Sequence, residues 1–243
     1  ERNMKFQWDG GFHINLLKNN LIYTDEYLEE LKKEGMTYVG MGIEAGSVAQ
    51  LERYQKRITP DDVMAVVKRL KRLKILSTYS FMIGAPHETY DDMIDTAKFI
   101  YKIRTTSPKY TYITGPSLFR PYPGGSVYDD AIKLCYKEKK TLEDWTNINT
   151  FTGYNTYKDL PYLESILPQI FNIFYYLKLV KALLYIDNKV VLAILRNKTV
   201  TNVMTSKFAV NSIGYVLRHV FENKLFDKFV SRKILGRSLI LEK

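Results

Sequence analysis

Short apolar or alternating stretches recur about every 35 residues over the first half of the chain, and stretches with apolar residues at helical spacing separate them. The pattern predicts strands at Met4–Trp8, Tyr38–Ile43, about 77–83 and Tyr110–Phe119. The first strand is expected to turn at residues 9–11, and Phe81, Met82 and Ile83 are expected to be buried. Because consecutive strands separated by helices pair in parallel, the chain is predicted to be α/β, as a piece of a barrel or of a doubly wound sheet.

Capping residues mark where the intervening helices begin. Four hydroxyl residues precede helical stretches and can accept a hydrogen bond from the first turn: Thr24, Ser47, Thr59 and Thr89. Pro60 follows Thr59 at the first helical position, where its missing N–H costs nothing. Gly35 is placed to end the first of these helices.

The pattern changes near residue 141. We expect a barrel part at residues 1–140, a connector rich in Asn, Thr and Tyr at 141–165, and a basic helical extension at 166–243. Helices in the extension are predicted at Ile166–Ile186, Val190–Leu195 and Asn211–Leu235. Pro168 and Lys178 are among the residues that interrupt the most apolar of them. An amphipathic helix packed on the barrel, on a partner or on a membrane surface is therefore expected rather than a spanning one.

Charge and cysteine content limit the partners and cofactors. The formal net charge is +10, and residues 166–243 hold 13 Lys+Arg against 4 Asp+Glu. This balance favours phosphate, nucleic acid or anionic lipid headgroups. The single cysteine, Cys135, excludes an internal disulfide and, with three histidines, an internal zinc or iron–sulfur ligand set. A cytoplasmic location is the default, with peripheral contact to a membrane through the basic tail.

Three predicted strands end in loops that carry acids, glycines or rigid turns, at residues 44–47, 84–88 and 120–125. The carboxyl ends of parallel strands are where such sheets bind ligands. Structural roles are the alternative. Glu44 can cap the following helix or pair with a lysine, and the helix dipole stabilises Glu88 whether or not a ligand binds.

In their order and spacing, G-M-G-I-E-A-G-S at 40–47, M-I-G-A-P-H-E-T at 82–89 and R-P-Y-P-G-G-S-V-Y at 120–128 resemble the radical S-adenosylmethionine (SAM) superfamily. The similarity is greatest to the cobalamin-binding branch that includes the anaerobic magnesium-protoporphyrin ester cyclase type. It covers roughly residues 4–145 and includes L-K-K-E-G at 31–35. It implies a partial (β/α) TIM-like barrel with parallel strands, followed by an α-helical C-terminal extension.

The resemblance also implies that these strand-end loops hold SAM. Glu44 and Ser47 would meet its ribose or amino-acid part. The backbone at Ile83 and Gly84 would pass beside the adenine, and Glu88 would brace that loop. A carboxylate can accept hydrogen bonds from ribose hydroxyls or an ammonium, and glycine lets a flat base lie against the main chain. These five residues form the predicted cofactor-binding set, and no catalytic residue is predicted.

The chain departs from the family at several positions. The family's CxxxCxxC loop, which holds a [4Fe–4S] cluster, has no counterpart here. We therefore expect a fragment whose missing N-terminal half holds the cluster and, in this branch, cobalamin. A degenerate homologue is the alternative. Ala45 stands where Ser is usual, His87 where Gly is frequent and Gly125 where Thr is frequent. His87 predicts a backbone that needs no positive φ.

The resemblance implies a radical SAM enzyme in the full-length protein, acting on a small-molecule substrate. A SAM-derived radical would abstract hydrogen, or SAM and cobalamin would deliver methyl. The chain alone is expected to be inactive. One alternative is a tRNA methylthiotransferase-like enzyme, although the basic tail lacks an evident β-rich RNA-binding module. The other is a non-catalytic barrel that serves as a binding or scaffold module.

The remaining reactive side chains have ordinary structural explanations. His13 and His87 could transfer protons because histidine titrates near neutrality, but surface or satisfied histidines are commoner. Cys135 follows Leu134 on a predicted helix and is expected to be a small core residue.

Overall fold

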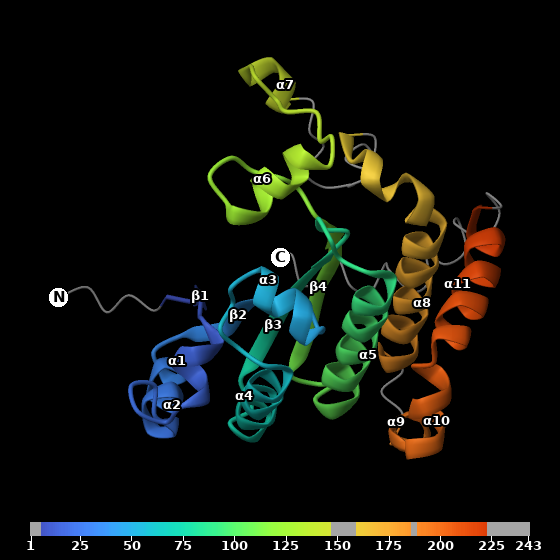
Figure 1. Cartoon of the computed structure of the whole chain (residues 1–243). Helices are drawn as coiled ribbons and strands as arrows, with labels where there is room; N and C mark the ends of the chain where they lie inside the picture. The colour runs from blue at the N-terminus through green and yellow to red at the C-terminus, as the bar shows by residue number, and fades with distance from the viewer. Residues whose placement is uncertain (1–5, 147–158, 186–188, 223–243) are drawn as a thin grey trace. The chain divides into compact units, whose positions relative to one another are not determined.

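The structure is a computed structural model that describes residues 6–146, 159–185 and 189–222 (Figure 1). The elements follow in this order: β1 (Trp8–Gly11), α1 (Ile14–Lys18), α2 (Asp25–Lys33), β2 (Met36–Glu44), α3 (Val48–Arg53), α4 (Pro60–Arg72), β3 (Leu76–Ile83), α5 (Tyr90–Thr106), β4 (Thr111–Leu118), α6 (Ser126–Lys133), α7 (Leu142–Thr146), the 3₁₀ helix η2 (Pro161–Ile166), α8 (Leu167–Tyr185), α9 (Lys189–Arg196), α10 (Lys198–Met204) and α11 (Lys207–Glu222). They fall into two compact units, residues 1–166 and 167–243.

The strands form one parallel sheet in the order β1-β2-β3-β4. Right-handed crossovers between neighbouring parallel strands return the chain on the same side each time, so the connecting helices share a face. Figure 1 shows α4 and α5 covering that face of the sheet. The α/β prediction is confirmed, and the consecutive strand order is that of a partial (β/α) barrel. A doubly wound sheet would place helices on both faces.

The two faces of the sheet differ in character. Apolar side chains that point toward the helices are buried: Val39, Met41, Ile43, Tyr79, Phe81 and Ile83. Phe81 meets Phe99 of α5 edge to face, with ring centroids 6.2 Å apart. The residues that alternate with them are half-buried: Gly40, Gly42, Thr78, Ser80 and Met82. All of these except Met82 are small or polar. The prediction that Met82 is buried was wrong, because strand alternation turns it to the second face.

Strand β1 begins later than predicted and extends through the expected turn. Gly10 and Gly11 pair with Val39 and Gly40 of β2, so residues 9–11 continue the strand. Met4 and Lys5 lie outside the described residues. Helix α1 was not predicted, because five residues are too few to show a helical period.

The predicted helix caps are confirmed. Thr24, Ser47, Thr59 and Thr89 each accept a hydrogen bond from a first-turn N–H of α2, α3, α4 and α5, respectively. Gly35 follows α2 with φ +96°, the left-handed conformation that ends helices. Ser47 and Thr89 thereby mark where the loops that follow β2 and β3 end.

Parts of the expected connector are helical: Trp145 lies in α7 and residues 161–166 form η2. Residues 147–158 of the connector lie outside the described part. The three-part division at 140 and 165 stays a prediction. Along the sequence, the boundary between the two compact units falls after Ile166.

The second unit is helical throughout its described residues. Helix α8 packs against α11, and a Cβ on Gly214 would lie 2.1 Å from the Asn172 carbonyl oxygen, so the two backbones approach closely there. Helices α8 and α9 confirm two predicted helices to within about a residue, and α10 was not predicted. Of the predicted helix Asn211–Leu235, residues 223–235 lie outside the described part. No described helix is long and apolar enough to cross a membrane.

Candidate functional site

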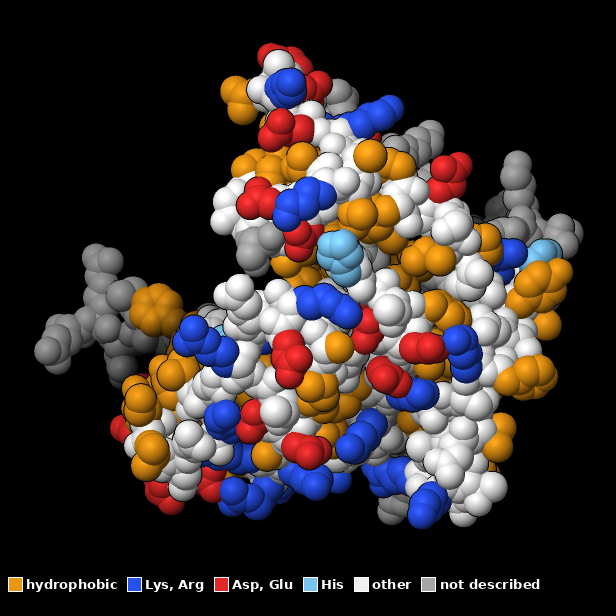
Figure 2. Space-filling view, in the orientation of Figure 1, with side chains coloured by type: hydrophobic (Ala, Val, Ile, Leu, Met, Phe, Trp, Pro, Cys, Tyr) orange, Lys and Arg blue, Asp and Glu red, His pale blue; other side chains and the backbone are white. Residues whose placement is uncertain are grey.

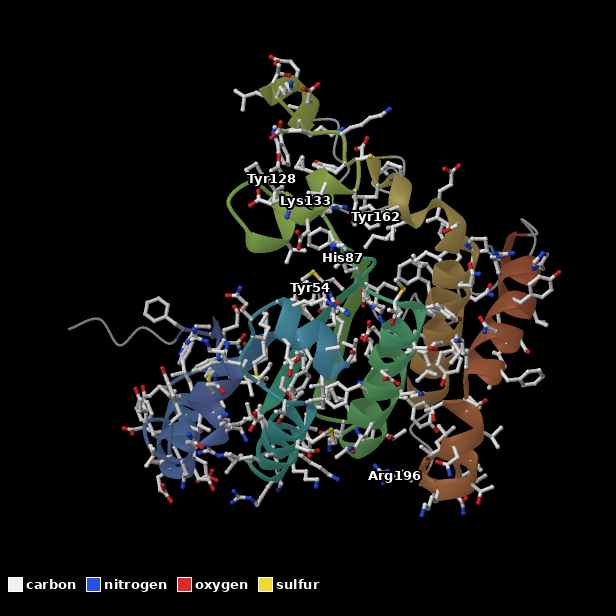
Figure 3. All side chains as sticks on the ribbon, in the orientation of Figure 1. Tyr54, His87, Tyr128, Lys133, Tyr162 and Arg196 are labelled. Carbon is white, nitrogen blue, oxygen red and sulfur yellow. The ribbon has the colours of Figure 1, made fainter. Side chains whose placement is uncertain are left out.

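The carboxyl ends of β2 and β3 lie next to each other, because Glu44 at the end of β2 is aligned with Phe81 of β3. The loops that follow these strands lead into α3 and α5. Figure 3 shows Tyr54, His87 and Tyr162 on this side of the sheet, with Tyr128 of α6 beyond them. The structure thus brings the loops 44–47 and 84–88 together at one edge.

Glu44 is held in an unusual backbone conformation. Its φ is +76°, at an irregularity in the pairing of β2 with β3, and such a conformation costs a non-glycine residue about 1–2 kcal/mol. Its carboxylate lies 3.1 Å from the ammonium of Lys56, and the two side chains are 21% and 24% exposed. Lys56 also donates to the Gly42 carbonyl at 3.4 Å. The structural alternative for Glu44, a pair with lysine, is therefore present.

Ser47 ties the β2 loop to α5. Its hydroxyl accepts from the Gln50 N–H at 3.3 Å and donates to the Asp92 carboxylate. Asp92 also accepts from Thr89 and, at 3.2 Å, from Arg53. Burial raises the pKa of Asp92, but the hydrogen bonds from Ser47 and Thr89 outweigh it and hold the pKa below its usual range. Ser47 is buried and its hydroxyl is engaged, so its role as a SAM ligand stays a prediction.

Gly46 lets α5 approach the β2 loop. A Cβ at this position would lie 2.6 Å from Cβ of Phe99 and 2.8 Å from Cα of Thr96. The Gly46 N–H donates to the Thr96 hydroxyl at 2.9 Å. This glycine of the strand-end motif therefore serves close packing of loop against helix.

The turn after β3 is built around Gly84, whose φ is +83°. The carboxylate of Glu88 accepts from the Gly84 N–H at 2.5 Å and from the Ala85 N–H at 3.0 Å. The Ile83 carbonyl accepts from the Phe119 N–H at 2.8 Å, which links the turn to the end of β4. Glu88 thus braces this loop, and contact of Ile83, Gly84 or Glu88 with SAM stays a prediction.

Glu88 is buried and titrates near neutrality. The residue is only 7% exposed, and its Oε1 atom has no hydrogen-bond partner among the described residues. Burial raises the pKa of Glu88 to about 7, the hydrogen bonds from Ala85 and Gly84 oppose the rise, and nearby Asp92 adds to it. The site therefore contains a carboxyl group whose pKa burial raises toward neutrality.

Tyr54 and Tyr162 converge on this carboxyl group. Burial raises the pKa of Tyr54 far above its usual range, and the charges of Glu88 and then Glu44 raise it further. The Gln50 side chain opposes this rise in the pKa of Tyr54. Neither Gln50 Nε2 nor the Tyr54 hydroxyl has a hydrogen-bond partner among the described residues. The Tyr162 hydroxyl donates to the Gly84 carbonyl at 3.2 Å.

Sequence reasoning missed Tyr54, Lys56 and Tyr162. Tyr54 and Lys56 follow α3 as one more aromatic and one more basic residue, which carries no distinguishing pattern. Tyr162 is 78 residues from Gly84 along the chain, so no local motif joins them. Only a lysine shortly after the strand-end acid Glu44 offered a signal for a charge pair.

The loop after β4 is a turn region. Gly124 has φ +90° and open space where a Cβ would be, so conformation alone requires glycine there. Tyr122 of this loop stacks on Trp145 with ring centroids 5.8 Å apart. The Tyr128 hydroxyl in α6 donates to Glu138 at 2.8 Å.

Two further predictions about single residues were wrong, those for His87 and Cys135. His87 has φ +60°, because the chain must turn sharply for Glu88 to reach back to the Gly84 and Ala85 amides. Cys135 is exposed, since α6 ends at Lys133 and the cysteine lies beyond it. His13 caps α1 by accepting from the Asn15 N–H at 3.2 Å. That contact is a structural role.

The residues of this chain do not fit an iron–sulfur cluster. Such a cluster needs at least three thiolates in this family, and the chain has one cysteine. The described residues also contain no group of three or more His, Cys, Asp or Glu side chains placed to hold a metal ion.

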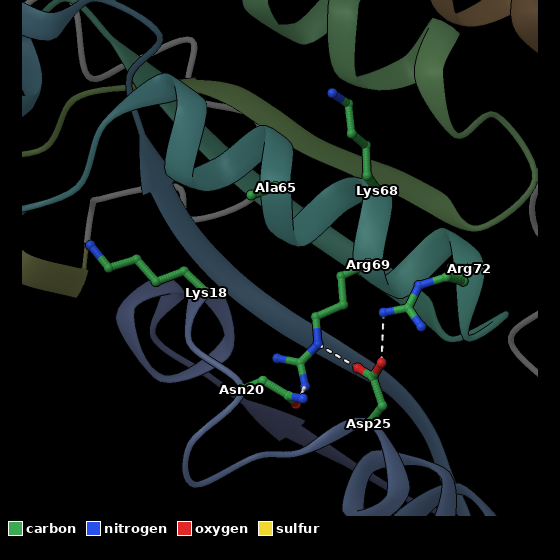
Figure 4. Close-up of a pocket in the computed structure, with 7 residues that line it drawn as sticks. All are labelled: Lys18, Asn20, Asp25, Ala65, Lys68, Arg69 and Arg72. Carbon is green, nitrogen blue, oxygen red and sulfur yellow. Dashed lines mark hydrogen bonds and ion pairs between the residues drawn. The ribbon is translucent and has the colours of Figure 1, made fainter.

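A polar pocket of about 410 Å³ lies between α1, α2 and α4 (Figure 4). Arg69 crosses it, with Nε 2.7 Å from Asp25 and a second nitrogen 2.6 Å from Asn20. Arg72 approaches the same carboxylate at 2.6 Å, and Lys and Arg side chains gather around this region (Figure 2). Its lining belongs to neither strand-end loop, and its arginines join α4 to α2 through Asp25.

Comparison with known proteins supports the superfamily indicated by the motifs. Residues 5–100 match the radical SAM superfamily. An uncharacterized methyltransferase of Pyrococcus horikoshii is 28% identical over 159 residues, which cover 63% of this chain and 32% of that protein. A tRNA-2-methylthio-N(6)-dimethylallyladenosine synthase of Ehrlichia canis is 24% identical over 115 residues, 46% of this chain and 25% of that protein.

An uncharacterized protein of Methanocaldococcus jannaschii is 27% identical over 115 residues and is covered to 22% of its length. The chain thus spans about a third or less of the length of the curated relatives it matches. The resemblance is confirmed at the level of the superfamily, whereas the cobalamin-binding branch stays a prediction. The parallel sheet, its strand-end loops and the match together identify residues 5–100 as a radical SAM superfamily domain.

Proposed function

We propose that the carboxyl edge of the sheet is the SAM-side and substrate-side half of the site of a radical SAM enzyme. In the full-length protein this site would serve hydrogen abstraction or cobalamin-assisted methyl transfer. The observation that carries the proposal is the partly exposed Glu44–Lys56 pair at the end of β2, next to the Gly84 turn. The name of the Pyrococcus relative, a methyltransferase, supports the methyl-transfer version.

The charge pair matches the amino-acid end of SAM, which carries one ammonium and one carboxylate. Lys56 can donate to that carboxylate, while Glu44 can accept from the ammonium or from ribose hydroxyls. The two groups lie 3.1 Å apart and each keeps part of its surface open. A zwitterion could therefore replace their mutual contact without leaving either charge unpaired.

The Gly84 turn offers a flat contact to the adenine. Its N–H donates to Glu88 and its carbonyl accepts from Tyr162, so neither group is free for a base edge. The contact with adenine would therefore be van der Waals contact with a part of the turn other than the side-chain position of Gly84, because Leu118 and Leu163 already fill the space there.

The second face of the sheet supplies the substrate side. The small or polar residues Gly40, Gly42, Thr78 and Ser80 alternate with the buried apolar residues, so they belong to this second face. In a barrel this face points inward, and small-molecule sites form where the barrel opens at the carboxyl ends of its strands. When bound beside an iron–sulfur cluster, SAM supplies the radical or the methyl group. The residues of this chain bind and orient it, and the cluster and any cobalamin would be held outside residues 1–243.

A tRNA-modifying enzyme is the second candidate. The name of the Ehrlichia relative and the net charge of +10 favour it. Binding of the chain to unmodified tRNA that weakens steeply with salt, together with SAM-dependent modification by the full-length protein, would support this candidate. Retention of SAM binding without any tRNA binding would count against it.

Titration calorimetry with S-adenosylhomocysteine tests the proposal on the chain itself. Glu44→Gln and Lys56→Gln should each weaken binding by about 1–3 kcal/mol, the range for a hydrogen bond involving a charged group. Lys98→Gln is the matched control, because Lys98 pairs with Asp95 on the exposed side of α5. Equal dissociation constants for all variants would return Glu44 and Lys56 to a structural role.

A further inference from the structure

We propose that residues 159–166, here called the strap, fix the ligand-side turn at Gly84, with Tyr162 and Leu163 as positioning residues for the adenosyl part of SAM. The strap consists of Asp159, Leu160 and η2. The inference rests on the proposed function for the ligand, while the clamp itself is a feature of the described structure.

The backbone of Gly84 is held at both of its polar groups by side chains. Glu88 accepts from its N–H at 2.5 Å, and Tyr162 donates to its carbonyl at 3.2 Å. Glu88 is four residues away on the same turn, whereas Tyr162 comes from the strap. A turn held on both sides keeps its left-handed conformation, φ +83°, before any ligand arrives.

Leu163 closes one side of the same glycine. A Cβ on Gly84 would lie 3.0 Å from Leu163 Cδ1 and 3.0 Å from Leu118 Cδ2, so the strap leaves room there only for hydrogen. Leu163 is 1% exposed and Leu160 is fully buried. The strap is therefore packed onto the turn after β3 through the Leu163 side chain as well as one hydrogen bond.

The start of the strap is anchored by an ion pair. Asp159 lies 2.9 Å from Lys139, which follows α6, and the two side chains are 25% and 19% exposed. The strap thus links the segment after α6, through the Lys139–Asp159 ion pair, to the turn after β3, through the Tyr162–Gly84 hydrogen bond.

Tyr162 stays a hydrogen-bond donor throughout the working pH range. Burial raises its pKa, and the charge of Glu88 raises it further. Its hydroxyl therefore keeps its proton for the Gly84 carbonyl even when Glu88 ionises.

The experiment compares Tyr162→Phe with Tyr128→Phe by hydrogen exchange and ligand binding. Tyr128 is the matched control, because its hydroxyl also makes one hydrogen bond, to Glu138, but none to Gly84. Tyr162→Phe should speed amide exchange in residues 84–88 by about 2- to 10-fold and weaken S-adenosylhomocysteine binding by a similar factor, the effect of one net hydrogen bond. Tyr128→Phe should leave both unchanged.

Leu163→Val provides a second variant that trims the contact with Gly84 and should raise exchange in the same peptide. If amide exchange in residues 84–88 is unchanged in both Tyr162→Phe and Leu163→Val, the proposal that the strap holds the Gly84 turn is wrong. Faster exchange with unaltered ligand affinity overturns its positioning role. If the unmodified chain binds no S-adenosylhomocysteine while Tyr162→Phe speeds exchange, the proposed function fails and the clamp on Gly84 stands.

Discussion

The buried carboxyl group of Glu88 should make the stability of this protein fall as the pH rises through neutrality. Its pKa is raised from an ordinary 4.5 to about 7, chiefly by burial. Between these values the folded state binds more protons than the unfolded state, so the free energy of unfolding decreases with pH. A shift of this size corresponds to about 3 kcal/mol, most of which is lost between pH 5 and pH 8.

Glu88→Gln removes this titration and keeps the brace. The amide oxygen of glutamine can still accept from the Gly84 and Ala85 N–H groups. We would measure the free energy of unfolding by urea denaturation at pH 5 and pH 8. Between these values it should fall by about 2–3 kcal/mol more in the unmodified chain than in the variant. Parallel curves for the two proteins would refute the burial of a titrating carboxyl group at the β3 turn.

Three further predictions follow from single features. Gly46→Ala should lower the free energy of unfolding by about 1–3 kcal/mol in denaturant titrations, because its Cβ would overlap α5 at Phe99 and Thr96, and an unchanged midpoint would contradict that contact. His87→Gly should keep or raise the melting temperature, since φ +60° suits glycine, and a clear loss of stability would contradict the positive φ. The basic residues 166–243 should make the chain co-sediment with vesicles containing phosphatidylserine and not with phosphatidylcholine alone, and equal sedimentation with both would refute the electrostatic contact.

Local chemistry explains why so much of the fold could be predicted from the sequence. A threonine or serine at a helix start acts within four residues, so Thr24, Thr59 and Thr89 could be recognised without tertiary information. The regular recurrence of strand and helix likewise predicted a parallel sheet. The turn expected at residues 9–11 failed because strand pairing, a tertiary effect, extends β1 through its glycines.

The site was predicted in part, because its members act across long sequence separations. The strand-end motifs located Glu44 and Glu88, but the roles of Gly46 and Ser47 became clear only when α5 was seen to pack against their loop. Tyr162 reaches Gly84 from 78 residues away. His87 showed that a reach-back hydrogen bond can impose a positive φ on a residue other than glycine.

The central claim is that the loops at the carboxyl ends of β2 and β3 contact SAM. Nuclear magnetic resonance of the isotope-labelled chain, titrated with SAM, tests it most directly. Amide shifts should concentrate in residues 42–47 and 83–88 and beside Lys56, and Glu44→Gln should reduce them. The absence of amide shifts at saturating SAM, or amide shifts confined to the polar pocket between α1, α2 and α4, would contradict the claim.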